Sequence, residues 1–184
     1  MKAGAASNDA YEAGLTEPSD LAGKTFGITT SGSSFHYMLS RIAEKEGFAV
    51  SDVKMKPLQK VGAIVGALTT GQIDAWVIQP SIAKRLLDEG AAQKIGTFAD
   101  YDPNYQVTAI FTSTGIAEGE REQTEAFLRA LSKGVADYNA AFVDKTADDA
   151  ERAELTEIVH QFVSVDVPHD RFAKDLAEGS MRIN

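Results

Sequence analysis

The sequence predicts an α/β protein: a mainly parallel sheet flanked by helices, followed by a helical C-terminal segment. Two observations support this prediction. Short apolar runs alternate with segments of helical spacing as far as Thr112, and only helical spacing follows Gly115. Alternation of this kind is typical of parallel sheets, because each parallel connection needs a crossover, which is usually a helix.

The individual elements follow from apolar spacing and from the residues that interrupt it. Strands are predicted, in chain order, at 24–29, 53–58, 73–78, 94–98 and 106–112. The helices between them repeat apolar residues at i, i+3, i+4 and i+7, and they end at Gly47, Gly71 and Gly90. Pro80 suits the first turn of the third helix.

The two ends of the chain have different patterns. Residues 1–20 are rich in Ala, Gly, Ser and Asp, and they predict a flexible lead-in over 1–18 with little to bury. The predicted α/β lobe spans 19–113. Residues 114–184 predict helices with apolar stripes along 127–142, 155–162 and 172–176.

Composition excludes several classes of function. The 184 residues contain 18 Lys and Arg against 27 Asp and Glu, a net charge of −9, with no basic cluster that could hold nucleic acid. Cysteine is absent, so disulfides and thiolate metal sites are excluded. No apolar stretch is long enough for a membrane span, and the first 20 residues lack the apolar core of a signal peptide. We therefore expect either a cytosolic protein or a chain without its true start.

A candidate ligand site lies where the predicted strands end. In an open α/β sheet, ligands bind beyond the carboxyl ends of the strands. This edge carries hydroxyls, amides and free backbone N–H groups, which suit a small polar or anionic ligand better than catalysis. The residues after the first three predicted strands are Ser31, Gly32, Ser33, Ser34, His36, Gln59, Gln79 and Pro80.

Other patterns have structural alternatives. Trp76, within the third predicted strand, is either a core residue or a ligand contact. Ser33 or Ser34 could simply cap a helix. Residues 101–105 predict a turn, with ligand contact left open. No metal site or cofactor is expected, because Glu157 and His160 lack the further ligands that a di-iron helix pair needs.

Several segments together resemble one known family. They are SDLAGKTFGITTSGSSFHYMLSRIAEKEGF, DVKMKPLQ, GALTTGQIDAWVIQPSIAKRLLDEGAAQKIGT and EAFLRALSKGVADYN. They are similar to the substrate-binding proteins of ABC importers, in the SsuA/THI5-like (NMT1) group that takes sulfonates, nitrate, taurine or thiamine pyrimidine. The resemblance runs from about Pro18 to Asn184, and it implies one lobe of the type II periplasmic-binding-protein fold.

The resemblance implies roles for the candidate residues. Ser31, Ser33 and Ser34 match the family's Ser-rich turn, which holds the charged end of the ligand, and His36 follows in the first helical turn. Gln79 and Pro80 stand where many members have Glu-Pro, and the missing charge favours a neutral or anionic ligand. The family's N-terminal lobe has no counterpart here, so we expect a fragment whose helical stripes are partly exposed and could form a dimer.

The expected function is therefore capture of a small anion or a thiamine-pyrimidine-like solute for an ABC permease, outside the cytoplasm. The chain is not expected to be an enzyme. A sensory ligand-binding module is one alternative. A thiamine-pyrimidine biosynthetic enzyme is another, but only His36 would be available there as a reactive group.

Overall fold

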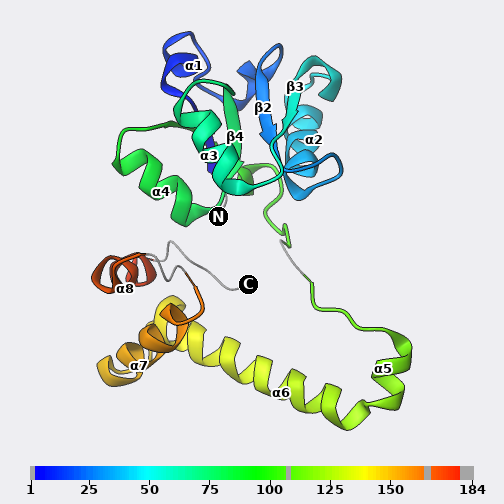
Figure 1. Ribbon diagram of the computed structural model, residues 1–184, viewed down its shortest axis with the longest axis vertical. Coiled ribbons are helices and arrows are strands. Elements are labelled where there is room, and N and C mark those ends of the chain that lie inside the picture. Colours follow the sequence, from blue (N-terminus) through cyan, green and yellow to red (C-terminus); the bar gives the residue numbers. More distant parts are fainter. Residues whose placement is uncertain (1–2, 107–108, 164–166, 179–184) are drawn as a thin grey trace. The chain divides into compact units, whose positions relative to one another are not determined.

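A computed structural model describes residues 3–106, 109–163 and 167–178 (Figure 1). The chain divides into two compact units, residues 1–107 and 108–184. The division lies a few residues before the predicted boundary at 113. Unit 1 contains all the strands of the described residues, and unit 2 contains helices.

The sheet of unit 1 has five strands in the order β3-β2-β4-β1-β5. Strands β2, β3 and β4 are parallel to one another, as predicted, whereas β1 runs antiparallel to both β4 and β5. Because β1 is antiparallel to both of these neighbours, β4 and β5 run in the same direction. The strands are β1 (Ala3–Ala6), β2 (Thr25–Ile28), β3 (Lys54–Pro57), β4 (Ala75–Ile78) and β5 (Gln93–Thr97).

The predicted flexible lead-in over 1–18 is wrong for its described residues. Ala3–Ala6 form β1 within the sheet, Asn8–Glu12 form α1, and Leu15 is fully buried. A Cβ added to Gly4 would lie 3.3 Å from the Ile95 side chain, a tight contact, so a larger residue here would require Ile95 to shift. A strand of Ala and Gly lacks the β-branched and aromatic residues that make strands recognisable.

The helices of unit 1 confirm the predicted spacing and stops. Ser34, Val61 and Pro80 begin them, and Gly47 adopts the left-handed conformation directly after the first one. They bury Met38, Ile64 and other apolar residues against the sheet. These helices are α2 (Ser34–Glu46), α3 (Val61–Thr69) and α4 (Pro80–Asp88), with short 3-10 turns at Pro18–Leu21, Val50–Asp52 and Phe98–Asp100.

The strand predicted over 106–112 is wrong for residues 106 and 109–112, which are irregular; 107–108 lie outside the described residues. Ile110 and Phe111 are exposed. An apolar run becomes a strand only where another strand supplies hydrogen-bond partners. None of the described strands pairs with these residues.

Unit 2 consists of helices among its described residues, which confirms the prediction for the C-terminal segment. Its small core contains Tyr138, Ala141, Phe142, Phe172 and Leu176. No helix of the described residues combines the length and apolar character needed to cross a bilayer. The helices are α5 (Thr114–Gly119), α6 (Arg121–Tyr138), a π-helical turn (Asn139–Val143), α7 (Asp149–His160) and α8 (His169–Ala177).

Candidate functional site

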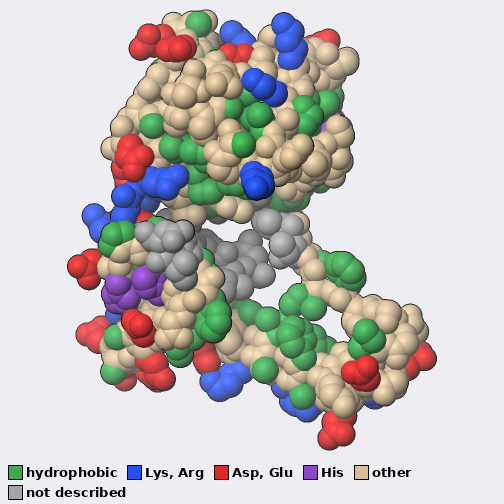
Figure 2. Space-filling model, in the orientation of Figure 1, with side chains coloured by type: hydrophobic (Ala, Val, Ile, Leu, Met, Phe, Trp, Pro, Cys, Tyr) green, Lys and Arg blue, Asp and Glu red, His purple; other side chains and the backbone are tan. Residues whose placement is uncertain are grey.

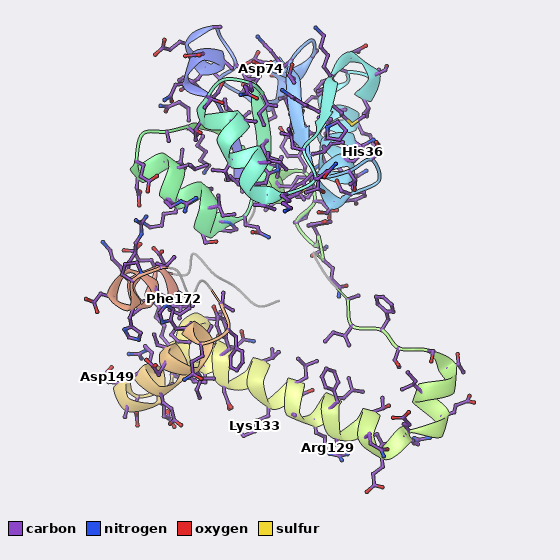
Figure 3. The ribbon with its side chains drawn as sticks, in the orientation of Figure 1. His36, Asp74, Arg129, Lys133, Asp149 and Phe172 are labelled. Atoms are coloured by element: carbon purple, nitrogen blue, oxygen red, sulfur yellow. The ribbon has the colours of Figure 1, made fainter. Side chains whose placement is uncertain are left out.

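The predicted ligand-binding residues lie at one edge of the sheet of unit 1. Because β3, β2 and β4 are neighbours and parallel, Gln59, the turn 29–34 and Gln79 all follow strand ends at the same edge. Figure 3 shows His36 at this end of unit 1 and Asp74, which precedes β4, at the opposite end. The structure thus places the predicted residues along a common edge, on three adjacent connections.

The turn between β2 and α2 presents the start of a helix. Ser33 is the residue before α2, and its Oγ accepts a hydrogen bond from the His36 backbone N–H at 3.5 Å. Gly32 has φ of +79°, a conformation that side chains other than Gly rarely adopt. The backbone N–H groups of the first turn and the helix dipole favour an anionic group here. Ser31 and Gly32 are exposed, and Ser34 is half-buried.

His36 turns back onto this loop rather than pointing away from it. The Gly32 backbone N–H donates to His36 Nδ1 at 3.0 Å, so Nδ1 is an acceptor and the proton of the neutral ring is on Nε2. One amide that sequence reasoning offered to a ligand is therefore used within the turn. The His36 side chain therefore stabilises the loop, and its Nε2–H is the group that it could donate to a ligand.

Gln59 and Gln79 differ in their backbone. Gln59 has φ of +63°, which is uncommon for a residue other than Gly and which concentrates at functional or tightly constrained positions. Its backbone N–H donates to Thr29 O at 2.9 Å, which joins the two neighbouring connections. Gln79 precedes Pro80, the first residue of α4, and both Gln side chains belong to exposed residues.

Trp76 lies beneath the site, in the core. It is 1% exposed, and its ring meets the Phe35 ring edge-on with centroids 5.3 Å apart. Its Nε1–H is buried without a hydrogen-bond partner, which is costly for a polar group. The packing role is evident from this burial, whereas a ligand contact remains a prediction.

A segment that includes the predicted turn 101–105 runs along α2. We call residues 98–105 the strap. Contacts near both ends of α2 hold the strap in place. Lys45 Nζ lies 5.8 Å from the Tyr101 ring centroid. From the C-terminal end of α2 to its N-terminal end, the attachments are Lys45 Nζ to Asp100 O (2.9 Å), Tyr101 OH to Glu46, and Tyr37 OH to Asp102 Oδ2 (2.9 Å).

The strap brings Tyr105 to the candidate site. Tyr105 stacks on Tyr37 with centroids 5.5 Å apart and an angle of 17° between the rings, and Phe98 meets it edge-on at 5.2 Å. Burial raises the pKa of the Tyr105 hydroxyl, while a hydrogen bond with the Ser34 side chain lowers that pKa to a smaller extent. Tyr105 thus contacts a predicted ligand-binding residue. The available signal was the loop 101–105, where the sequence leaves ligand contact open, but the partners of its tyrosines could not be read from spacing.

The chemistry of this edge is that of hydrogen bonding. Its groups are mainly hydroxyls, amides, backbone N–H groups and one imidazole, with the Asp102 carboxylate held by the Tyr37 hydroxyl beside them. Within the ranges that the structure describes, no group of three or more His, Asp or Glu side chains could hold a metal ion. The arrangement can hold a small polar or anionic molecule by its charged end, with aromatic rings beside it.

Comparison with known proteins gives a family and a fold. The family model described as NMT1/THI5 like matches residues 9–141. The comparison with curated proteins gave no significant match. Among solved structures, the chain is similar to the alkanesulfonate-binding protein SsuA from Xanthomonas axonopodis pv. citri bound to MOPS, with a TM-score of 0.68 and 21% identity over 96% of this chain.

Two further solved structures have the same fold. The periplasmic aliphatic sulphonate binding protein SsuA from Escherichia coli gives a TM-score of 0.67 at 18% identity over 95% of this chain. A sulfonate-binding protein SsuA from Methylobacillus flagellatus gives 0.65 at 15% over 100%. The chain covers 54%, 51% and 50% of these three proteins, so it spans about half of their length. The three are named as binding proteins, not as enzymes.

Proposed function

The chain belongs to the NMT1/THI5-like family, and from this premise we propose that it is a solute-binding component of an ABC importer. Its task is to capture a small molecule and deliver it to a membrane permease. Capture of this kind needs donors and acceptors in fixed places, and no chemical step on the ligand. We therefore propose a binding protein, not an enzyme.

One observation supports this proposal most strongly: uncharged hydrogen-bonding groups gather at the carboxyl edge of β3, β2 and β4, around the start of α2. The predicted ligand-binding residues Ser31, Gly32, Ser33, Ser34, His36, Gln59, Gln79 and Pro80 all lie on these connections. A biosynthetic enzyme would need a reactive group at this edge. His36 is the titratable candidate, and its Nδ1 already accepts the Gly32 N–H.

The proposed ligand is a small anion. The N-terminus of α2 favours negative charge, and Gln79 adds none of its own where many family members carry Glu. Two of the similar structures are named for alkanesulfonates or aliphatic sulfonates, and MOPS, bound to one of them, is itself a sulfonate. We propose a sulfonate-like organic anion for this chain, with a thiamine-pyrimidine-like solute as the alternative. A sensory role for the same binding site is a further alternative.

The proposed location is outside the cytoplasm, next to the permease. The E. coli neighbour is named as periplasmic. A solute-binding component meets its permease on the outer side of the membrane, so location and partner follow from the same proposal. Fractionation of the source cells with an antibody against the chain tests this part, and a purely cytosolic signal contradicts it.

The proposal is tested by titrating the isotope-labelled chain with ethanesulfonate, taurine, nitrate, acetate and a hydroxymethylpyrimidine in an NMR experiment. We expect the backbone amides of Ser33, Ser34 and Phe35 to shift with sulfonates. Affinity is expected to be weak, about millimolar, because a single lobe supplies only part of the contacts that a two-lobed clam makes on closure. Ethylammonium, a cation of similar size, is the control. An absence of shifts at these amides with every compound contradicts the proposal.

A further inference from the structure

We propose that Tyr105 is a specificity-determining residue of this site, and that it selects anions with an apolar or aromatic body over bare anions such as nitrate. This inference rests on the proposed function and names the substrate class of the same site. It starts from the strap, whose contacts no spacing in the sequence predicts.

The position of Tyr105 is fixed by contacts of the residues that precede it in the chain. Asp102, three residues earlier, accepts the Tyr37 hydroxyl at 2.9 Å, and its backbone O accepts the Tyr105 N–H at 3.3 Å. Further back, Tyr101 and Asp100 are tied to the other end of α2. Because these attachments span the helix, the Tyr105 ring is held beside the first turn instead of sampling solvent.

The ring belongs to an aromatic wall. Tyr37 stacks on Tyr105, Phe98 meets it edge-on, and Tyr37 remains 44% exposed. The wall stands at the start of α2, because Tyr37, on which Tyr105 stacks, lies in the first turn that Ser34 begins. An anion whose charged end meets the first-turn N–H groups therefore has its remaining atoms near aromatic surface. Contact with that surface stabilises an apolar body and gives nothing to an ion that lacks one.

A second polar group lies under the same turn. Phe35, which follows Ser34, packs against Trp76, whose indole N–H is buried and has no hydrogen-bond partner. Buried polar groups are normally paired. Trp76 is 1% exposed, so it lies in the packing beneath the helix start.

The hydroxyl of Tyr105 has a separate part in the proposal. It lies beside the Ser34 hydroxyl at the helix start, and the Tyr105 O–H can donate to an anion there. The ring then sets the preference for the ligand body, and the hydroxyl contributes to holding the charged end. These two contributions can be separated by substitution.

The experiment measures binding of methanesulfonate and benzenesulfonate, which share a head group and differ in their body. Titrations use the chain and its variants Tyr105→Ala and Tyr105→Phe. With Tyr105→Ala we expect the affinity for benzenesulfonate to fall roughly five- to tenfold and that for methanesulfonate to fall about twofold. With Tyr105→Phe, which keeps the ring, we expect both affinities to fall by a similar factor of about two to five.

Tyr11→Ala is the matched control. Tyr11 is also half-buried against the core of unit 1, but it lies in α1, which follows the end of β1 at the opposite edge of the sheet. We expect this variant to lose some stability and to keep the preference between the two sulfonates. Tyr37→Phe removes the hydroxyl that Asp102 accepts and is expected to reduce the preference by a smaller factor, because the strap is then less firmly held.

The outcomes separate the two proposals. If the unaltered chain binds neither sulfonate, the proposed function fails, and this inference fails with it. If the chain binds both sulfonates and Tyr105→Ala changes the two affinities by the same factor, or changes neither, the specificity role of Tyr105 is wrong while the proposed function stands. Should Tyr105→Ala fail to fold, Tyr105→Leu removes the aromatic face but keeps bulk, and the same comparison decides.

Discussion

The two units of this chain bury their apolar residues to very different extents. In unit 1 the strands and helices share one extensive core that includes Phe26, Trp76 and Leu39. In unit 2 five residues form the buried cluster, while Phe127 is 55% and Leu128 is 46% exposed on α6. Figure 2 shows hydrophobic side chains gathered over α6. A sheet with helices on its faces buries nearly all of its apolar surface, whereas an amphipathic helix needs a partner for its stripe.

The polar face of α6 does little to compensate. It carries two ion pairs between residues one helical turn apart. Arg121 Nε lies 2.8 Å from Glu125 Oε1, and Lys133 Nζ lies 2.6 Å from Asp137 Oδ2. Exposed ion pairs of this kind contribute little to stability, because water screens the charges and ordering two long side chains costs entropy. Unit 1 is therefore stabilised by an extensive packed core. The stability of unit 2 depends on a small apolar cluster at one end of α6.

The largest expected effect is in the core of unit 1. Phe26→Ala should lower the free energy of unfolding by about 3–5 kcal/mol, because Phe26 is fully buried in β2 and its loss leaves a cavity. Trp76 is the one tryptophan of the sequence, so its emission in a urea titration reports on unit 1. Phe142→Ala in unit 2 is the control. In this variant we expect part of the helical circular dichroism signal to be lost at a lower urea concentration, while the urea midpoint of the Trp76 emission does not change. Equal shifts of both signals in either variant would show that the units unfold together.

Alanine substitutions at two glycines, one in each unit, should change stability in opposite directions. A Cβ at Gly27 would lie 2.5 Å from Ile73 Cδ1 and 2.7 Å from Ile64 Cγ2, so Gly27→Ala should destabilise unit 1 by about 1–3 kcal/mol. Gly134 lies in α6 with nothing within 4 Å of such a Cβ, and Gly134→Ala should stabilise the helix by about 0.4–1 kcal/mol. Thermal unfolding of the two variants measures both. A destabilising Gly134→Ala would mean that this face of α6 is covered in solution.

The exposed stripe should affect association more than stability. Leu128→Ser is expected to change the free energy of unfolding by less than about 0.5 kcal/mol, because the side chain is already 46% exposed. Binding of an apolar dye and the mass measured by light scattering should both fall, since contiguous exposed apolar surface promotes association. Asp137→Ala, on the polar face of the same helix, is the control. A sharp monomer without dye binding in the unaltered chain would contradict the predicted dimer through these helices.

The smallest expected effect depends on pH. Backbone N–H groups of Thr16 and Glu17 donate to Asp20 Oδ2, each at 3.0 Å, and they lower the pKa of this carboxyl from its usual 3.8. A group whose pKa is lowered by folding stabilises the fold while it is ionised, so the contribution is present at neutral pH and is lost as the pH falls below the unfolded value. Asp20→Asn should therefore lower the melting temperature at pH 7, and this effect should shrink as the pH falls through the lowered folded pKa. Glu12→Gln, on the exposed side of α1, should be neutral across the same pH range.

Much of unit 1 could be predicted from sequence because its signals are local. The helical spacing at Phe35, Met38 and Leu39, and the apolar run that contains β4, each lie within one element. Strand β1 was missed because Ala and Gly have no strand signature, and its partners lie far along the chain. The strand predicted at 109–112 was wrong because apolar residues alone do not supply a neighbouring strand to pair with.

The candidate site divides in the same way. Its residues on the strand connections were predictable, because parallel strands end at one edge and the residues after each strand are adjacent in sequence to it. The strap was not predictable, since it depends on pairs such as Tyr37 with Asp102 and Glu46 with Tyr101, which meet only in the folded chain. The bond from Gly32 N–H to His36 was equally hidden, although the two residues are four positions apart.

Strand β1 has a consequence for how this protein acquires its fold during synthesis. Ala3–Ala6 precede every other described strand in the chain, yet they pair with Ala75–Ile78 and Gln93–Thr97. The ribosome must therefore deliver residues as far as Thr97 before the sheet can close around its earliest strand. Until Ala75–Ile78 follow, β1 has no partner among the described strands, and until Gln93–Thr97 follow, one of its flanks stays open to other chains. A chaperone that covers this strand would protect the nascent protein.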